Sequence, residues 1–305
     1  MEYDVIIVGG GPGGYTAALY AARAGLSALV LEMLGPGGQM ATTNNIENYP
    51  GFDEPVDGFD LAQKMQNGAH RAGARTAYEE VTGLELAASP KLVHTRKNTY
   101  RAKAVILAMG ASPRQLGLPE EDALRGRGVT YCATCDGMMY RGKVVAVNGG
   151  GNSAAEDALV LAKICEKVYI IHRRDTLRAD RAYLAPLEKA GNVEFVWNSR
   201  VAGLEYGDKL TGVTLEDVKT GQRRSLPVEG LFIAIGRKPE TALVEGQVAL
   251  TPGGYVDAGE DTRTSLPGVF AVGDIREKPL RQIVTAAADG AVAAKMAQEY
   301  IAGMA

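Results

Sequence analysis

The chain has 305 residues, of which 46% are hydrophobic and 23% charged, and its formal net charge is −3. This composition excludes a disordered, collagen-like or coiled-coil protein, and the weak negative charge without a long basic run argues against nucleic-acid binding. No apolar stretch approaches the roughly 18 residues that a membrane span requires, so no membrane partner is expected. The strand pattern that begins at Tyr3 leaves no room for a signal peptide, and we therefore expect a cytoplasmic protein of about two domains.

The N-terminal residues predict a strand, a glycine-rich turn, a helix and a second strand. A strand over residues 4–8 leads into the pattern G-x-G-x-x-G over 9–14, an alanine-rich helix over 15–25 and a strand over 28–31 that is followed by Glu32. Glycine in such a turn lets the backbone approach a pyrophosphate at the N-terminus of a helix. Because a carboxylate can accept hydrogen bonds from ribose hydroxyls, Glu32 favours an adenosine without a ribose phosphate, as in FAD or NAD.

The same arrangement returns later in the chain. A strand over 143–147 leads into the pattern G-x-G-x-x-A over 149–154, a helix over 155–165 and a strand over 168–171. The residue 23 positions after the first glycine is Glu32 in the first copy (32 − 9) and His172 in the second (172 − 149). Arg173, Arg174 and Arg178 follow His172, and guanidinium groups pair well with a 2′-phosphate. The second turn is therefore predicted to bind NADPH.

Further repeats predict how the domains are organised. The segments 105–110 and 231–236 each indicate a short buried strand that ends at glycine. Each is preceded by a β-rich stretch, 75–101 and 193–228, in which we expect small antiparallel ribbons. The strand within 268–274 and the helix over 283–301 follow no glycine turn of their own, so we expect them to complete the first domain.

The expected fold class is α/β, with two Rossmann-like three-layer nucleotide-binding domains, the second inserted into the first and each with a small antiparallel β ribbon. Residues 1–112 and 245–305 are assigned to the first domain and residues 113–244 to the second. The chain is expected to cross between them near 111–119 and 239–246.

Cys132 and Cys135 form a Cys-x-x-Cys pair just before the first strand of the second domain. This spacing lets two thiols close a disulfide ring and reopen it at modest strain, and the carboxyl group of Asp136 can donate or accept a proton beside them. Half of a zinc site is the structural alternative, but Cys165 and the three histidines offer no second paired spacing, so no metal is expected. Cys165 itself is interpreted as a buried packing residue.

Over essentially its whole length the chain resembles the low-molecular-weight thioredoxin reductases, whose active-site motif matches residues 132–137. The resemblance implies FAD in the first domain, NADPH in the second and a homodimer. It implies that Cys135 is the thiol next to the flavin, that Cys132 is the outer thiol that attacks a protein disulfide, and that Asp136 is the acid–base. A flavin and a hydride donor in one chain also imply that electrons pass from one to the other.

The expected cofactor contacts lie at the two glycine turns and at segments that resemble the family's nucleotide contacts. Those for FAD are Gly9, Gly11, Pro12, Gly14, Glu32, Gly38, Gln39, Asn48, Gly273, Asp274, Arg281 and Gln282. Those for NADPH are Gly149, Gly151, Asn152, Ser153, Ala154, His172, Arg173, Arg174 and Arg178.

Four residues, at three places in the chain, depart from the family's pattern. Asn148 precedes the second glycine turn where an aliphatic residue is usual, and Met109 stands where threonine is common. Met138 and Met139 replace frequent aromatic residues close to where a thioredoxin would dock, and adaptable methionine surfaces do not select one partner.

The sequence leads to the hypothesis that NADPH gives hydride to FAD, that the reduced flavin opens the Cys132–Cys135 disulfide, and that the dithiol exchanges with thioredoxin. Because the dithiol and the NADPH turn share one domain and both must reach a flavin in the other, the inserted domain is expected to rotate between two states. The alternatives are a flavin disulfide reductase for another protein disulfide, a small-molecule dithiol oxidase, and a non-enzymatic nucleotide-binding redox sensor.

Overall fold

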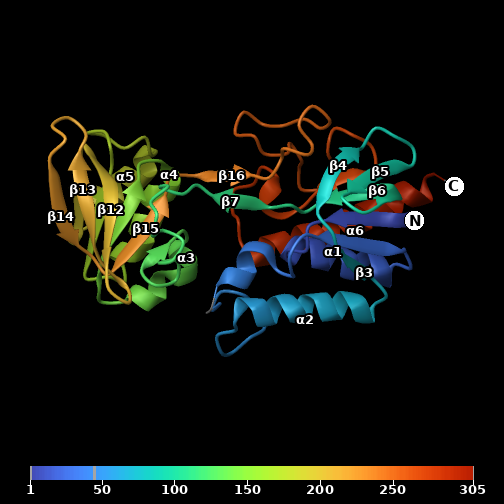
Figure 1. The fold of residues 1–305 in the computed structure, drawn as a ribbon, viewed down its shortest axis with the longest axis horizontal. Coiled ribbons are helices and arrows are strands. Elements are labelled where there is room, and N and C mark those ends of the chain that lie inside the picture. Colours follow the sequence, from blue (N-terminus) through green and yellow to red (C-terminus); the bar gives the residue numbers. More distant parts are fainter. Residues whose placement is uncertain (1, 44–45, 305) are drawn as a thin grey trace. The chain divides into compact units, whose positions relative to one another are not determined.

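A computed structural model describes residues 2–43 and 46–304 of the protein. The chain forms two compact units: the first joins Met1–Ser112 to Lys238–Ala305, and the second is Pro113–Arg237 (Figure 1). The sequence analysis assigned residues 238–244 to the inserted domain, whereas they group with the first unit. The reason is packing, because Leu243 and Val244 lie against the hydrophobic core of that unit.

The first unit is built on a seven-stranded sheet of order β3-β2-β1-β6-β5-β4, with β17 paired to β6. Its pairings are parallel except for those of β5 with β6 and with β4. Because β17 pairs with β6, the C-terminal segment returns to the first sheet, as its lack of a glycine turn suggested. The strands are β1 (Glu2–Val8), β2 (Ala28–Glu32), β3 (Arg75–Tyr78), β4 (Val81–Glu85), β5 (Lys91–Thr95), β6 (Thr99–Leu107) and β17 (Val269–Ala271).

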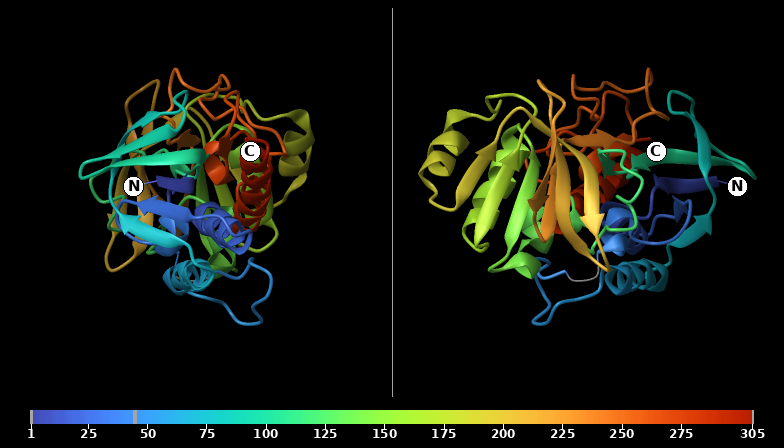
Figure 2. Two further views of the ribbon diagram at one scale, coloured as in Figure 1. Left: turned by 90° about the vertical axis from the view of Figure 1, so that its right-hand side faces the viewer. Right: turned by 60° about the vertical axis from the view of Figure 1, so that its left-hand side comes forward.

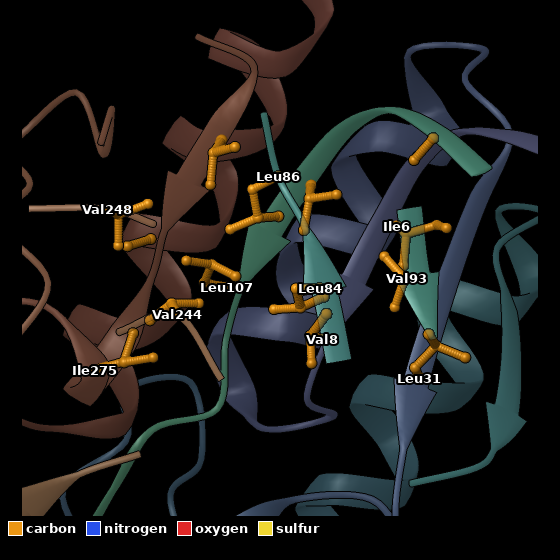
Figure 3. Packing of buried hydrophobic residues seen from close by; sticks show 14 of the residues in the cluster. Ile6, Val8, Leu31, Leu84, Leu86, Val93, Leu107, Val244, Val248 and Ile275 are labelled. Atoms are coloured by element: carbon orange, nitrogen blue, oxygen red, sulfur yellow. The ribbon is translucent and has the colours of Figure 1, made fainter. Parts of the chain in front are cut away.

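Alternating side chains of β1 enter two separate cores. Val5 and Ile7 pack against residues of three helices, α1 (Pro12–Arg23), α2 (Gly58–Arg71) and α6 (Ile283–Ala302), of which α1 and α6 lie side by side (Figure 1; Figure 2). Ile6 and Val8 belong to the opposite core, which they share with β4 and with Val244 in the segment that follows β16 (Figure 3). The sheet therefore has helices on one face and strands and loops on the other.

The second unit repeats this layered plan with a five-stranded parallel sheet of order β11-β10-β9-β15-β8. Val145 and Val147 pack under helices α4 (Asn152–Ala162) and α5 (Arg181–Lys189), whereas Ala146 faces a three-stranded antiparallel ribbon. The strands of the sheet are β8 (Val129–Thr130), β9 (Val144–Gly149), β10 (Lys167–Ile171), β11 (Val193–Val196) and β15 (Gly230–Ala234). Those of the ribbon are β12 (Ser199–Tyr206), β13 (Leu210–Asp217) and β14 (Arg223–Pro227). Both units therefore have the predicted fold class.

Short elements complete the chain. Strands β7 (Ala111–Pro113) and β16 (Arg237–Pro239) pair as a two-stranded sheet at the two points where the chain passes from one unit to the other. The remaining helices are η1 (Gly38–Thr42), α3 (Ala133–Asp136), η2 (Gly137–Tyr140) and η3 (Gly273–Ile275).

The sequence analysis did not identify helix α2. Its first turn is capped by Asp57, whose carboxylate accepts hydrogen bonds from the N–H groups of Phe59 and Asp60. Its buried face is formed by Leu61, Ala62 and Ala69, and this helical spacing was the available signal. Within the described part of the chain, no helix combines the length and apolar character that crossing a bilayer requires.

Helix α6 lies against helix α1 at Gly290, and this close contact leads to a prediction about stability. A Cβ atom at this position would lie 2.3 Å from the carbonyl oxygen of Gly13 and 2.9 Å from the backbone nitrogen of Ala17. Backbone atoms cannot give way unless the two helices separate. We therefore predict that Gly290→Ala lowers the free energy of unfolding by about 1–3 kcal/mol, as overpacking does elsewhere, and denaturant unfolding measures it.

Gly68 in α2 is the matched control, because no atom lies within 4 Å of the position that its Cβ would occupy. Gly68→Ala should raise the free energy of unfolding by roughly 0.5–1 kcal/mol, since alanine loses less conformational entropy in a helix. An equal gain in stability from both substitutions would contradict the tight contact of α1 with α6.

Candidate functional site

The first glycine turn is shaped by contacts that only glycine allows. Gly9 has φ of +104°, and a Cβ there would lie 2.5 Å from the carbonyl oxygen of Ala108. A Cβ on Gly14 would lie 2.0 Å from the Gly9 oxygen, whereas Gly11 has open space at this position. Helix α1 begins at Pro12 without a capping side chain. Its first N–H groups are therefore available to an anion such as a pyrophosphate.

Glu32 lies at the end of β2 with its carboxylate held beside this turn. Its Oε2 accepts a hydrogen bond from the Gly10 N–H at 2.7 Å, and its Oε1 accepts one from the Met33 N–H at 2.9 Å. Oε1 also accepts one from the Leu34 N–H at 3.2 Å, which leaves Oε2 with a further lone pair for a ligand hydroxyl. The geometry therefore fits a ribose at this position.

Other predicted FAD contacts are joined to the turn or to one another by hydrogen bonds. The Gly37 N–H donates to the Gly10 carbonyl at 2.8 Å, which places Gly38 and Gln39 of η1 next to the turn. The Asn48 amide donates to Gln282 Oε1 at 3.0 Å and so joins two segments that are far apart in the sequence.

Arg281 is the strongest indication of a ligand in this unit. Its Nε and Nη2 atoms are buried without a hydrogen-bond partner, Nη2 forms an ion pair with Glu277 Oε1 at 3.7 Å, and the guanidinium lies 4.1 Å from the ring centroid of Tyr255. Buried guanidinium N–H groups without an acceptor are costly, and a ligand rich in oxygen would satisfy them. The residues present therefore fit a bound dinucleotide such as FAD.

Sequence reasoning missed Asp289, which supports the Gly273–Asp274 turn. Its Oδ2 accepts from the Gly273 N–H at 2.9 Å and from Lys278 Nζ at 2.7 Å, and its two oxygens form a bidentate pair with Arg276. Burial opposes ionisation of this carboxyl, but the two cations hold the pKa of Asp289 below its usual value. An acid among the alanines of the first two turns of α6 was the signal that could have revealed it.

The second glycine turn also lies against the carbonyl oxygen of an alanine at a strand end, as the first turn does. A Cβ on Gly149 would lie 2.3 Å from the carbonyl oxygen of Ala234, while Gly151 again has open space. Helix α4 starts at Asn152 without a capping side chain, and Ser153 and Ala154 follow in its first turn. The Asn152 side chain forms hydrogen bonds with the side chain and backbone of Asp180.

The basic segment after β10 folds back over this turn. The Arg178 N–H donates to the Gly150 carbonyl at 2.7 Å, and the His172 ring packs where a Cβ on Gly150 would be. His172 is 7% exposed, and its Nε2 is buried without a hydrogen-bond partner. Burial, together with the charges of the neighbouring arginines, lowers the pKa of His172. The side chains of Arg173, Arg174 and Arg178 are exposed, and three guanidiniums beside a glycine turn fit a phosphorylated ribose.

Cys132 and Cys135 are joined by a disulfide, with 5.3 Å between their Cα atoms, which confirms the predicted pair. Cys132 is the N-cap of α3, and its sulfur accepts a hydrogen bond from the Cys135 N–H at 3.2 Å. The Asp136 carboxyl accepts a hydrogen bond from the Thr130 hydroxyl. Burial raises the pKa of Asp136, against the lowering effects of Thr130 and Arg125, so this carboxyl holds its proton to a higher pH than an exposed one.

The other residues that the sequence analysis singled out differ in how far they are buried. Cys165 is free and buried, as expected, and burial raises its pKa to about 11. Met109 packs against the first core and Asn148 is buried within β9, whereas Met138 and Met139 are 46% and 49% exposed. Among the described residues, no group of three or more His, Cys, Asp or Glu side chains is placed to hold a metal ion.

Comparison with known proteins agrees with this chemistry. Residues 3–290 match the family of pyridine nucleotide-disulphide oxidoreductases. Thioredoxin reductases of Streptomyces clavuligerus and Treponema pallidum are 46% and 44% identical to the chain, over 99% and 98% of its length and 95% and 97% of theirs. The crystal structure of thioredoxin reductase from Streptococcus pyogenes has a TM-score of 0.92 at 42% identity, with 99% of each chain covered. The thioredoxin reductase of Giardia duodenalis has a TM-score of 0.91 at 35% identity, again with 99% of each chain covered. The chain therefore belongs to the pyridine nucleotide-disulphide oxidoreductase family, in which its relatives are thioredoxin reductases.

Proposed function

We propose that the protein is an NADPH-dependent thioredoxin reductase that carries electrons from NADPH through FAD and the Cys132–Cys135 disulfide to oxidised thioredoxin. One observation supports this assignment above the others. A Cys-x-x-Cys disulfide lies in the same unit as a glycine turn that is followed by exposed arginines, and the other unit has a glycine turn beside the carboxylate of Glu32. This combination supplies a donor site, a flavin site and a disulfide exchanger in one chain.

FAD, when bound, supplies a ring that accepts hydride from NADPH and delivers an electron pair to the disulfide. The residues of the first unit would bind and orient it. The first turn of α1 would face the pyrophosphate, Glu32 would accept hydrogen bonds from the ribose, and Arg281 would donate to ligand oxygens. The other proposed contacts are Gly9, Gly11, Pro12, Gly14, Gly38, Gln39, Asn48, Gly273, Asp274 and Gln282.

NADPH would be held by the second unit. The open side of Gly151 leaves room for the pyrophosphate at the start of α4, and the exposed guanidiniums of Arg173, Arg174 and Arg178 would pair with the 2′-phosphate. His172 stays neutral because its pKa is lowered, so its Nε2 accepts or donates a hydrogen bond without adding charge. The other proposed contacts are Gly149, Asn152, Ser153 and Ala154.

The dithiol would carry out two exchanges. The Cys132 thiolate attacks the disulfide of thioredoxin and forms a mixed disulfide, and one thioredoxin sulfur leaves as a thiolate. Cys135 then attacks the Cys132 sulfur, which reforms the intramolecular disulfide and releases the second thioredoxin sulfur. Asp136 donates and recovers protons beside these sulfurs. The sum is NADPH, a proton and a disulfide giving NADP⁺ and a dithiol.

The inserted unit is proposed to rotate about the two crossings, because its dithiol and its nicotinamide site would both need the same flavin. The family resemblance supports a homodimer. A dithiol that must be kept able to cycle supports a reducing compartment such as the cytoplasm.

The first prediction of this proposal separates the two halves of the reaction. Replacement of Cys132 or Cys135 by serine should abolish NADPH-dependent reduction of thioredoxin, whereas NADPH should still bleach the flavin absorbance of the variant. Stopped-flow absorbance measures the bleaching, and insulin precipitation measures thioredoxin reduction. Cys165→Ser is the control and should leave both unchanged, because this buried thiol takes no part in exchange. Loss of bleaching in the Cys132 and Cys135 variants would show that these cysteines only support the fold.

A second prediction concerns the choice of nucleotide. The double substitution Arg173→Ala and Arg174→Ala should raise the KM for NADPH by roughly 10- to 100-fold, because a charge-assisted hydrogen bond contributes about 1.5–3 kcal/mol and solvent screening reduces this contribution at exposed guanidiniums. The KM for NADH should change little, since NADH lacks the 2′-phosphate. Steady-state kinetics with both nucleotides gives this ratio, and Arg223→Ala on β14 is the control for lost surface charge. An equal rise in both KM values would remove the 2′-phosphate assignment.

A further inference from the structure

A short turn of chain before β8 carries two charged side chains that reach the redox segment. Its backbone bonds are helical, since the Leu124 N–H donates to the Glu120 carbonyl at 3.1 Å and the Arg125 N–H to that of Asp122 at 3.3 Å. Glu121 and Arg125 are four residues apart and therefore lie on the same side of this turn. No motif in the sequence analysis included either residue.

Glu121 binds the residue that precedes the first cysteine. It is 2% exposed, and its carboxylate accepts hydrogen bonds from the N–H groups of Leu116 at 3.0 Å and Gly117 at 2.9 Å. The Tyr131 hydroxyl donates to the same carboxylate at 2.6 Å. Burial and this carboxylate raise the pKa of Tyr131, so the hydroxyl keeps its proton and remains a donor. The side chain next to Cys132 is therefore fixed at its far end.

Arg125 packs on the same tyrosine. Its guanidinium lies 5.3 Å from the ring centroid of Tyr131, within the range of a cation–π interaction. Tyr131 is therefore held at its hydroxyl by Glu121 and over its ring by Arg125. The charge of Arg125 also lowers the pKa of Asp136, against the larger effect of burial.

Three other polar or titratable side chains face the redox segment, and none of them contributes a positive charge. Thr130 on β8 donates its hydroxyl proton to Asp136, and Tyr140 on η2 stays neutral because burial raises its pKa to about 12. Asp157 on α4 accepts a hydrogen bond from the Ala133 backbone, and burial raises its pKa to about 7. The charges that act on Asp157 are those of Glu156 and Arg237, so its titration does not depend on Arg125.

We propose that Glu121 and Arg125 are positioning residues for the redox segment. Glu121 holds the hydroxyl of Tyr131 and Arg125 lies over its ring, so together they fix the side chain beside Cys132 and with it the backbone at this cysteine. The inference rests on the proposed function, in which Cys132 attacks a partner disulfide. It adds the residues that hold the nucleophile in place.

The Arg125 half is tested by hydrogen exchange of the backbone at residues 129–132 in the oxidised protein. Arg125→Met removes the cation that lies over the Tyr131 ring, so these amides should exchange several-fold faster, as peptide mass spectrometry records. Arg125→Lys keeps a cation that can lie over the ring and should restore most of the wild-type protection. Arg200→Met, which removes an exposed arginine from β12, should leave the exchange of these residues unchanged.

The Glu121 half is tested with Tyr131→Phe, which removes only the hydroxyl that Glu121 holds. In the chemically reduced protein, a less restrained Cys132 should react several-fold faster with iodoacetamide, as peptide mass spectrometry records at this cysteine. Tyr206→Phe is the control, because this tyrosine of the same unit is 51% exposed. Exchange at residues 129–132 that does not change in Arg125→Met, or a Cys132 rate that does not change in Tyr131→Phe, would overturn the proposal. Neither measurement uses NADPH or thioredoxin, so failure of wild-type turnover would count against the proposed function alone.

Discussion

The architecture of both units depends on a contact that leaves no room for a side chain. In each unit, a strand end, a glycine turn and the start of a helix meet at this contact. The Cβ positions of Gly9 and Gly149 lie 2.5 Å and 2.3 Å from the carbonyl oxygens of Ala108 and Ala234. These alanines begin the Ala-x-Gly segments at the ends of β6 and β15. The sequence repeats both the glycine turn and the Ala-x-Gly segment. In each unit, these two repeated segments contact each other. That contact places the first turn of the helix at the sheet edge, where its N–H groups would face the phosphates of the proposed nucleotide.

The two units share this framework and differ in the residues at the end of the second strand. In the first unit, the Glu32 carboxylate is held against the glycine turn by backbone N–H groups, which suits hydroxyl recognition. In the second, buried His172 and the exposed arginines replace it, which suits a phosphate. The redox disulfide precedes β9 in this second unit, so the chain order assigns the proposed NADPH site and the dithiol to one body. The proposed electron path depends on these differences rather than on the fold itself.

Features that depend on local pattern were predictable from the sequence, and features that depend on long-range contact were not. The glycine turns, their flanking strands and the Cys132–Cys135 pair repeat or have short spacings, and the structure contains them. Residues 238–244 were misassigned because their place is decided by the packing of Val244 against a core built from other parts of the chain. Asp289 meets its partners across 11 to 16 residues, and Glu121 meets Tyr131 across 10, separations at which periodicity carries no signal.

The central claim is that an electron pair passes from NADPH through a bound flavin to the Cys132–Cys135 disulfide and on to thioredoxin. An anaerobic absorbance titration of the purified protein tests it most directly. The account predicts a yellow protein whose flavin absorbance is lost on addition of NADPH and returns on addition of oxidised thioredoxin, with one thioredoxin dithiol formed for each NADPH consumed. A colourless protein, or a bleached flavin that oxidised thioredoxin does not reoxidise while another disulfide does, would contradict it.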